Sequence, residues 1–324
     1  MVLLKPTTAQ ASMLKDTDVL SAKQFDKEKL QAILNTAFHY EQALKEKRRL
    51  YDMDGKIMAS LFFEPSTRTR LSFETAMQRL GGTVVTVSES PQTQSSSVAK
   101  GETLHDTIAV VDSYVDVIVM RSPLKGAGVI AANAAQKPVI NGGDGVGEHP
   151  TQALLDIYTI AKEKGKLDGL KVVMVGDLKN GRTVHSLSRF MALYGNDMIF
   201  VSPKELMMPV DLTAELRQVG ARIKENEDLA AMVKQADVLY VTRVQKERFS
   251  DPEEFERVKD MCIVNNDIVK DAKEGMVIMH PLPRVNEIAV SVDRYPGSAY
   301  FRQPANGVPI RMALLAMVTG NVKL

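Results

Sequence analysis

The sequence is poor in several features that mark particular classes of protein. It contains one cysteine, Cys262, so no disulfide can form within the chain and a Cys-rich metal site is excluded. A reducing compartment fits this composition. Lys and Arg number 41 and Asp and Glu 40, which leaves a net charge of +1 and no broad field for nucleic acid or an acidic membrane. Any anion that the protein binds must therefore meet cations that are gathered locally.

Long apolar runs are also missing. The nearest candidates, residues 57–63 and 312–318, fall well short of the roughly 18 apolar residues that a membrane span needs. The first 20 residues lack the apolar stretch and small-residue cleavage site of a secretory signal. We therefore expect a soluble, cytoplasmic protein, or one of an organelle such as the plastid if a transit peptide has been removed.

The length and the pattern of the sequence predict two domains of one class. At roughly 150 residues per domain, 324 residues suit two domains, and 44% hydrophobic and 25% charged residues are ordinary for a folded protein. Short apolar or β-branched runs alternate with longer stretches of helical period, so we expect an α/β fold, with two parallel-sheet α/β domains joined by interdomain helices. Eight strands are expected, in two sheets of about four: residues 57–63, 84–87, 115–120, 139–141, 172–176, 199–202, 238–242 and 277–280.

A glycine-rich segment separates the two predicted halves. Residues 141–150 (NGGDGVGEHP) contain four glycines and a proline, which end one strand and open a helix. We predict a first domain over residues 1–148 and a second over residues 149–304. The last apolar helix, within about residues 305–324, is expected to pack back on the first domain.

The most informative segment is residues 62–82 (FFEPSTRTRLSFETAMQRLGG), where Pro65 ends a strand and apolar residues then recur with helical period. Residues 66–69 (STRT) thus lie at a helix N-terminus, where free backbone N–H groups, hydroxyls and a guanidinium together suit a phosphate. The plainer interpretation is an N-cap with solvated Arg68 and Arg70. It is less favoured, because cations there oppose the helix dipole by about 0.3–1 kcal/mol and need an anion.

Arginines also stand at the ends of later strands. Arg121 directly follows one predicted strand and Arg243 another, and open α/β sheets bind ligands at the carboxyl ends of their strands. With Arg182 and Arg284 in similar positions, we interpret the set as a site for carboxylates and phosphate. Residues 176–183 (GDLKNGRT) come close to a Walker A loop, but Arg182 replaces its lysine and no later strand ends in the Asp of a magnesium site, so support for an NTPase is weak.

Histidine and proline add two further candidates. None of the five histidines pairs with another at metal-binding spacing, so no metal is expected. His149 precedes Pro150 at a predicted helix start, where a neutral imidazole is favoured and could donate to a carbonyl oxygen; a capping or structural role is equally supported. In residues 280–284 (HPLPR), two prolines force an irregular backbone, and the carbonyl of Leu282 can then face a ligand ammonium.

Five motifs, STRTR, HPTQ, DLKNGRTVHS, TRVQKERF and HPLPR, occur in one order over residues 64–311. Together they closely resemble the aspartate carbamoyltransferases, part of the aspartate/ornithine carbamoyltransferase superfamily. STRTR and HPTQ are shared with the ornithine enzymes, whereas TRVQKERF and HPLPR indicate the aspartate branch, since the SMG and HCLP segments typical of the ornithine enzymes are absent. The resemblance implies transfer of the carbamoyl group of carbamoyl phosphate to the α-amine of L-aspartate, in pyrimidine biosynthesis, without a cofactor.

The resemblance also implies the domain roles and the site. The first domain would bind carbamoyl phosphate, the second aspartate, and a homotrimer would share its active sites between chains, Ser96 and Lys100 reaching into the neighbouring site. Relatives commonly have His where Ser122 stands. The implied residues for carbamoyl phosphate are Ser66, Thr67, Arg68, Thr69, Ser96, Lys100, Arg121, His149 and Gln152. Those for aspartate are Lys100, Arg182, Arg243, Gln245 and Leu282. Those for catalysis are Arg68, Thr69, Lys100, Arg121 and His149.

Two alternatives stay open at this point. One is a carbamoyltransferase with another amine acceptor such as ornithine, whose cationic side chain Arg243 would repel. The other is a non-catalytic homologue that binds metabolites or partners. The resemblance also leaves room for a regulatory subunit or a larger multienzyme assembly.

Overall fold

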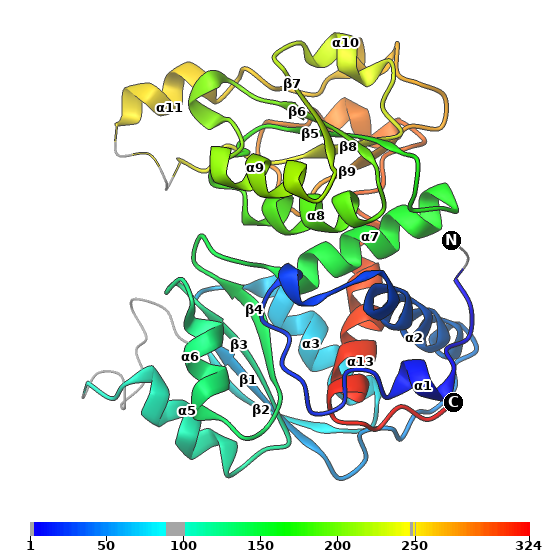
Figure 1. Cartoon of the computed structure of the whole chain (residues 1–324), viewed down its shortest axis with the longest axis vertical. Helices are drawn as coiled ribbons and strands as arrows, with labels where there is room; N and C mark the ends of the chain where they lie inside the picture. Colours follow the sequence, from blue (N-terminus) through cyan, green and yellow to red (C-terminus); the bar gives the residue numbers. More distant parts are fainter. Residues whose placement is uncertain (1–2, 89–100, 247–248, 250) are drawn as a thin grey trace. The chain divides into compact units, whose positions relative to one another are not determined.

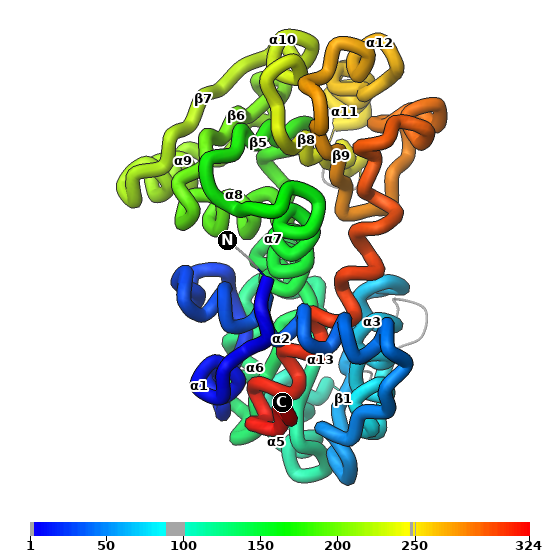
Figure 2. Tube along the Cα trace, turned by 90° about the vertical axis from the view of Figure 1, so that its right-hand side faces the viewer, coloured from blue at the N-terminus to red at the C-terminus, as the bar shows by residue number. Residues whose placement is uncertain are grey.

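The computed structural model describes residues 3–88, 101–246, 249 and 251–324. These residues form two compact units (Figure 1): an N-terminal unit, Leu3–Tyr158 with Asn306–Leu324, and a second unit, Thr159–Ala305. The chain passes from one unit to the other within helix α7 (Pro150–Lys164) and again near Ala305, as the trace in Figure 2 shows. Among the described residues, no helix is long and apolar enough to span a membrane.

The N-terminal unit is built on a four-stranded parallel sheet in the order β2-β1-β3-β4. Its inner strands are buried along almost their whole length, which is why they read as continuous apolar runs rather than as an alternating pattern. The strands are β1 (Ile57–Phe62), β2 (Thr83–Ser88), β3 (Val117–Ser122) and β4 (Val139–Asp144).

Helices cover both faces of this sheet. Helices α5 and α6 pack together on one face, where Ile108 and Ala131 meet Leu61 and Ile118 in a common core. On the other face lies α3, and α13 packs against both α3 and α2. Helix α13 is buried almost throughout, as its apolar sequence requires, and this includes its single charged residue, Arg311. The helices are α1 (Thr8–Ala11), η1 (Ala22–Gln24), α2 (Lys27–Lys45), α3 (Thr67–Arg79), α5 (Leu104–Asp112), α6 (Ala127–Ala134) and α13 (Gly307–Val318).

The second unit contains a five-stranded parallel sheet in the order β7-β6-β5-β8-β9. Helices α8 and α9 contact one side of it, while α10 and α12 belong to the core cluster around Val173 and Val241. The strands are β5 (Lys171–Val175), β6 (Asp197–Val201), β7 (Arg222–Asn226), β8 (Val238–Val241) and β9 (Val277–Met279). The helices are α8 (Arg182–Leu193), η2 (Lys204–Leu206), α9 (Val210–Gln218), α10 (Leu229–Val233), α11 (Pro252–Val258), α12 (Asn266–Val269), η4 (Val290–Arg294) and η5 (Gln303–Asn306).

Two features of the fold differ from the prediction. The described residues form nine strands, because β7 (sequence RIKEN) pairs with β6 at the edge of its sheet. Its side chains are mostly exposed and charged, so it has no apolar run to reveal it. The units also divide between Tyr158 and Thr159, inside α7 (Pro150–Lys164), rather than in the glycine-rich segment, which forms β4 and the turn after it.

In each sheet the order of the strands reverses at one point. From β1 the connection leads outward to β2, whereas β3 lies on the other side of β1 and leads to β4; β5 and β8 stand in the same relation in the second unit. Loops that leave two adjacent strands in opposite directions open a crevice at their carboxyl ends, which is where open α/β sheets bind ligands. Most of the predicted site residues that the structure describes lie in or next to the loops at these two points.

Candidate active site

The loop from β1 into α3 presents polar groups that could bind a ligand. Ser66 is the N-cap residue of α3 in an extended conformation (φ −155°, ψ 106°), but its side chain makes no capping hydrogen bond to any described residue. Thr67 and Arg68 are exposed, and Thr69 is buried. The N–H groups of this first turn have no partner within the helix, so the turn presents donors and hydroxyls together. Ser66 is thus the N-cap residue by position, but its hydroxyl does not make the hydrogen bond of an ordinary cap.

Arg121 and Arg68 form a cationic pair beside this turn. Arg121 lies near the end of β3, opposite Phe62 in the ladder with β1, and its guanidinium contacts Glu64 at 3.0 Å. Burial, and then the positive charge of Arg121, lower the pKa of Arg68. Two guanidiniums that repel each other, one of them paired with a carboxylate, leave net positive charge at the start of α3. This electrostatic arrangement favours an anion.

Gly142 in β4 lies against Thr69 and Arg121. A Cβ placed on Gly142 in β4 would lie 3.6 Å from Cγ2 of Thr69, 3.7 Å from Cβ of Arg121 and 3.1 Å from the carbonyl oxygen of Met120. Both predicted side chains therefore converge on the backbone of β4. The tightest of these approaches is to the carbonyl oxygen of Met120, so a side chain at this position would press first on the backbone of β3, while Thr69 and Arg121 would lie at ordinary contact distance.

The glycine-rich segment after β4 is held by its own side chains. Asp144 accepts hydrogen bonds from the N–H groups of Gly126 and Glu148, each at 2.7 Å. Ser122, where relatives carry His, accepts from the N–H of Leu124 at 3.2 Å and so fixes the turn after β3. These contacts give the segment a defined path toward the start of α7.

His149 and Gln152 stand at the start of α7, in the same unit. His149 is buried, and its carbonyl accepts a hydrogen bond from the N–H of Gln152 at 3.1 Å. The side chain of Gln152 is also nearly buried, and its Nε2 donates to Oδ1 of Asp156 at 2.9 Å. The helix thus fixes both predicted residues through its first turn and through a carboxylate one turn further on.

In the second unit, Asp177 joins the loops that follow β5 and β8. It is fully buried; Oδ1 accepts from the N–H of Asn180 at 2.9 Å and Oδ2 from the N–H of Gln245 at 3.5 Å. Gln245 in turn donates from Nε2 to the carbonyl of Asn180 at 3.2 Å. Burial raises the pKa of Asp177, against the hydrogen bonds of Asn180. Arg182 is the first residue of α8, directly after the first of these loops, and Arg243 lies in the second; the strands that precede them, β5 and β8, are neighbours in the sheet.

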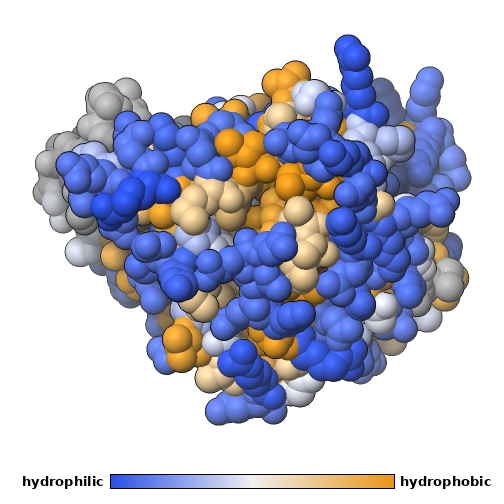
Figure 3. Space-filling model, turned by 90° about the horizontal axis from the view of Figure 1, so that it is seen from above, coloured by the Kyte–Doolittle hydropathy of each residue, from blue (hydrophilic) through white to orange (hydrophobic). Residues whose placement is uncertain are grey.

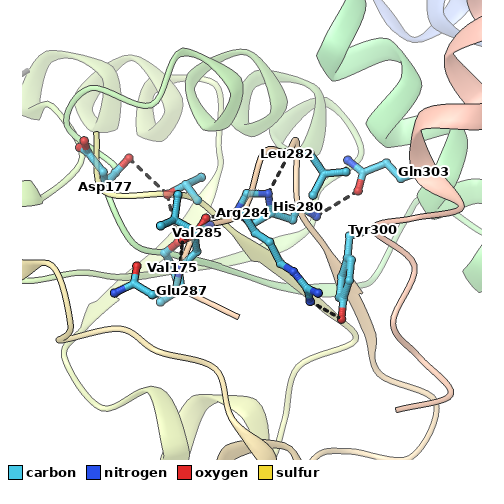
Figure 4. A network of polar contacts seen from close by, with 11 residues as sticks. Val175, Asp177, His280, Leu282, Arg284, Val285, Glu287, Tyr300 and Gln303 are labelled. Carbon is cyan, nitrogen blue, oxygen red and sulfur yellow. Dashed lines mark hydrogen bonds and ion pairs between the residues drawn. The ribbon is translucent and has the colours of Figure 1, made fainter. Parts of the chain in front are cut away.

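The loop after β9 is held by a buried network, drawn in Figure 4. His280 donates its backbone N–H to Oε1 of Gln303 at 3.0 Å, and its Nδ1 accepts from the N–H of Leu282 at 2.8 Å. Nε2 of His280 therefore carries the proton and donates to Oε1 of Glu287 at 2.7 Å. Leu282 has φ 56° and precedes a cis peptide bond to Pro283. The network thus fixes the backbone on which the predicted Leu282 carbonyl lies.

Arg284 differs from its prediction. Its guanidinium pairs with Asp293, with Nη2 to Oδ2 at 2.8 Å, and stands 5.3 Å from the ring centroid of Tyr300 and 5.2 Å from that of Phe301. The ion pair and the two rings use its charge within the fold. Arg284 is therefore not among the arginines that we assign to a ligand.

Sequence reasoning missed some residues of the site, and two of the predicted site residues fall outside the part of the chain that the structure describes. Ser96 and Lys100 fall outside the described residues. The missed residues are the carboxylates that hold the predicted side chains or their loops, namely Glu64, Asp156, Asp177 and Glu287. Glu64 and Asp177 follow directly on strands, and Gln152 and Asp156 share one helix face at a spacing of four, so the sequence held a signal for three of them.

A hollow of about 330 Å³ lies elsewhere in the second unit, at the carboxyl ends of β6 and β7. It is lined by Phe200, Met207 and Met208 together with Glu225 and Glu227, among others, and by none of the predicted site residues. An acidic, methionine-rich hollow does not suit two anionic substrates.

The face seen in Figure 3 is largely hydrophilic, with hydrophobic residues gathered near its middle.

Two domain models of one protein family match the chain. "Aspartate/ornithine carbamoyltransferase, carbamoyl-P binding domain" matches residues 17–163, and "Aspartate/ornithine carbamoyltransferase, Asp/Orn binding domain" matches residues 168–318. The chain belongs to the aspartate/ornithine carbamoyltransferase family. This confirms the predicted family and, with it, a carbamoyltransferase as the class of enzyme.

Members of this carbamoyltransferase family resemble the chain over nearly its full length. The aspartate carbamoyltransferase catalytic subunit of Thermococcus onnurineus is 51% identical over 306 residues, covering 94% of this chain and 98% of that protein. The solved catalytic subunit of M. jannaschii aspartate transcarbamoylase is 49% identical, with a TM-score of 0.87 over 94% of this chain and 98% of its own. Aspartate transcarbamoylase from Trypanosoma cruzi, solved in complex with carbamoyl phosphate and aspartate, is 40% identical, with a TM-score of 0.89 over 97% and 99%. The predicted fold class is confirmed.

Proposed function

We propose that the chain is an aspartate carbamoyltransferase, which converts carbamoyl phosphate and L-aspartate into N-carbamoyl-L-aspartate and phosphate in de novo pyrimidine biosynthesis. The observation that carries the proposal is the Arg68–Arg121 pair beside the open first turn of α3. Carbamoyl phosphate brings about two negative charges and aspartate two carboxylates, so a chain of net charge +1 must concentrate its cations where these substrates bind.

The N-terminal unit is the proposed carbamoyl phosphate domain. The first turn of α3, with Ser66, Thr67, Arg68 and Thr69, binds the phosphate through backbone N–H groups, hydroxyls and a guanidinium. At the start of α7, the carbamoyl group meets His149 and Gln152. Thr69 and Arg121 share its oxygen, which is supported by the contact that both side chains make with the position of Gly142. Support comes from the position of these residues next to β1 and β3, the switch point of the sheet.

The second unit is the proposed aspartate domain. Arg182, Arg243 and Gln245 bind the carboxylates of aspartate, and the carbonyl of Leu282 accepts a hydrogen bond from its amine. The first three lie in the loops that Asp177 joins, and Leu282 lies in the loop after β9, the strand next to β8. A guanidinium fork matches a carboxylate in geometry as well as in charge.

The chemistry needs little beyond positioning and charge. The neutral α-amine attacks the carbamoyl carbon, and Thr69, Arg121 and His149 stabilise the negative charge that develops on the oxygen of the tetrahedral intermediate. Collapse of the intermediate breaks the bond from carbon to the phosphate oxygen, and the leaving phosphate takes the proton of the amine. Alignment of the two substrates supplies much of the acceleration, because it replaces an encounter in solution by a reaction within one complex.

The assembly and the location complete the proposal. A homotrimer shares its active sites between chains, with Ser96 and Lys100 from one chain serving the site of its neighbour. The chain works in the cytoplasm, or in an organelle such as the plastid if a transit peptide has been removed. Relatives are named catalytic subunits, which supports a regulatory subunit or a larger multienzyme assembly as partner.

An assay with two acceptors tests the proposed activity. Purified protein and carbamoyl phosphate should release phosphate only when an acceptor is present, and kcat/KM should be at least about a hundredfold higher for L-aspartate than for L-ornithine, because Arg243 repels the ornithine side chain. Phosphate and carbamoylated product are measured together. Faster turnover with ornithine would assign the other acceptor, and binding of carbamoyl phosphate without turnover would indicate the non-catalytic homologue.

Glu287→Gln should weaken the use of aspartate. The amide has one oxygen where the carboxylate has two, so either Nε2–H of His280 or the N–H groups of Val285 and Asn286 lose their acceptor. We expect KM for aspartate to rise about tenfold, a cost of about 1.4 kcal/mol, with KM for carbamoyl phosphate changed less than about twofold. The exposed Glu274→Gln is the matched control, and equal effects of the two variants would contradict the role of the network.

The same carboxyl group links stability to pH. Burial opposes ionisation of Glu287, but the hydrogen bonds from His280 and from backbone N–H groups prevail and hold its pKa below the usual 4.5. Its contribution to stability is thus complete above about pH 4.5 and is lost as the pH falls through the pKa of the folded state. Denaturant unfolding should show a gap between wild type and Glu287→Gln that is constant at neutral pH and narrows in acid.

A further inference from the structure

A buried pair of opposite charges, which the reaction described above does not use, lies next to Gln152. Asp156 in α7 and Arg311 in α13 are 0% and 2% exposed. Burial lowers the pKa of Arg311 to about 10, and the charge of Asp156 acts in the opposite direction, so the guanidinium stays protonated at neutral pH. Both residues belong to the N-terminal unit, as do the predicted carbamoyl phosphate residues.

The surroundings of Arg311 are shaped to hold it. Its guanidinium carbon stands 4.9 Å from the ring centroid of Phe73 in α3, a cation–π contact. A Cβ on Gly307, one turn earlier in α13, would come within 2.2 Å of Nη1 of Arg311, so the guanidinium occupies the space that the absent side chain leaves. Arg311 thus ties α13 to the helix that begins with Ser66–Thr69 and lies within electrostatic reach of Asp156.

The link from this pair to the site is the hydrogen bond from Nε2 of Gln152 to Oδ1 of Asp156, at 2.9 Å. An ionised carboxylate accepts hydrogen bonds and donates none, so the amide of Gln152 must turn its nitrogen toward Asp156. The carbonyl oxygen Oε1 then points away from Asp156 as an acceptor. Without a charge on Asp156, either end of the amide could face the substrate.

We propose that Asp156 is a positioning residue that turns Oε1 of Gln152 toward the N–H of the carbamoyl group and so makes the site select a carbamoyl over an acyl group. The inference rests on the proposed function, since it takes Gln152 as a carbamoyl contact. A site built to accept a hydrogen bond rejects an analogue that lacks the donor, because its own acceptor is left unpaired. Acetyl phosphate is that analogue, with a methyl group in place of the amine.

The test compares three ligands on Asp156→Asn. Dissociation constants of carbamoyl phosphate, acetyl phosphate and inorganic phosphate are measured by calorimetry on wild type and variant. Asparagine has nearly the shape of aspartate but can also donate, which frees the amide of Gln152 to turn over. We expect the preference for carbamoyl over acetyl phosphate to fall about five- to tenfold, with the affinity for inorganic phosphate changed less than about twofold. A merely structural role would weaken all three ligands alike.

Two further variants keep the inference testable. Asp156→Asn leaves Arg311 without its counter-charge, so the double variant Asp156→Asn/Arg311→Met removes both buried charges together and should fold even where the single variant does not. It should lose the preference to the same extent. In a Gln152→Ala background, Asp156→Asn should change the preference no further, because the two residues act through one contact.

Each outcome decides something definite. The inference alone is contradicted if the wild type is active and both Asp156 variants keep its preference for carbamoyl over acetyl phosphate. It is also contradicted if Asp156→Asn lowers this preference equally with and without Gln152. A wild type that transfers no carbamoyl group contradicts the proposed function and the inference with it. A fall in preference confined to chains that retain Gln152 supports both.

Discussion

Replacing Arg68 by alanine should reduce kcat/KM for carbamoyl phosphate by ten- to a hundredfold or more. The variant loses a charge-assisted contact to the phosphate, worth about 1.5–3 kcal/mol, and each 1.4 kcal/mol corresponds to about a factor of ten. Arg68 is exposed and lies under the repulsion of Arg121, so its removal should leave the melting temperature nearly unchanged. Steady-state kinetics with thermal unfolding on the same preparations separates the two effects.

Arg70→Ala is the matched control. It removes the same charge from the same end of α3, but Arg70 lies 3.8 Å from Glu74 and belongs to no proposed contact. We expect kcat/KM to change less than about threefold, as for other side chains distant from the ligand. Equal losses in the two variants would show that the field of the helix end, rather than a contact of Arg68, attracts the phosphate. An unchanged value for Arg68→Ala would remove its role.

The Arg68 variant also tests whether sites are shared between chains. In a homotrimer in which Lys100 serves the neighbouring site, mixing Arg68→Ala with Lys100→Ala chains creates interfaces that combine the two intact residues. Activity should then rise above that of either parent preparation measured alone. Mixed trimers are first confirmed by separating chains that carry different tags. Mixed trimers without recovered activity would place both residues in one chain's own site.

Much of the N-terminal part of the site could be predicted from local sequence. An apolar run, a proline and a return of helical period put residues 66–69 at a helix start, and the structure begins α3 at Thr67. Arg121 was located in the same way, from the end of an apolar strand. These features depend on neighbours in the chain, which is why they are visible without a fold.

The residues that orient the site could not be predicted so well, because their partners are distant or hidden by burial. Arg311 and Asp156 act on each other from α13 and α7, more than a hundred residues apart in the sequence. Arg284 shows the opposite error: its position after a strand matches that of Arg243, but Asp293 and two aromatic rings take up its charge. The position of a charged residue in the sequence shows where its backbone lies and leaves its partner open.

Arg243→Ala should be as severe on the aspartate side as Arg68→Ala is on the phosphate side. A guanidinium that holds a carboxylate by two charge-assisted hydrogen bonds contributes about 3 kcal/mol, so we expect kcat/KM for aspartate to fall about a hundredfold, chiefly through KM. Binding of carbamoyl phosphate should be unaffected, because the loops after β5 and β8 belong to the other unit. Arg243→Lys keeps the charge without the fork and should lose about tenfold.

The acceptor itself supplies the sharpest control for Arg243. L-asparagine has the same shape as aspartate but lacks the charge of the side-chain carboxylate, so if Arg243 binds that carboxylate, the variant should lose far less with asparagine than with aspartate. Arg217→Ala, which removes an exposed arginine from α9 of the same unit, should leave both acceptors unchanged. An equal loss with both acceptors would indicate that Arg243 binds the α-carboxylate, which the two acceptors share. A loss in carbamoyl phosphate affinity would instead remove Arg243 from the aspartate site.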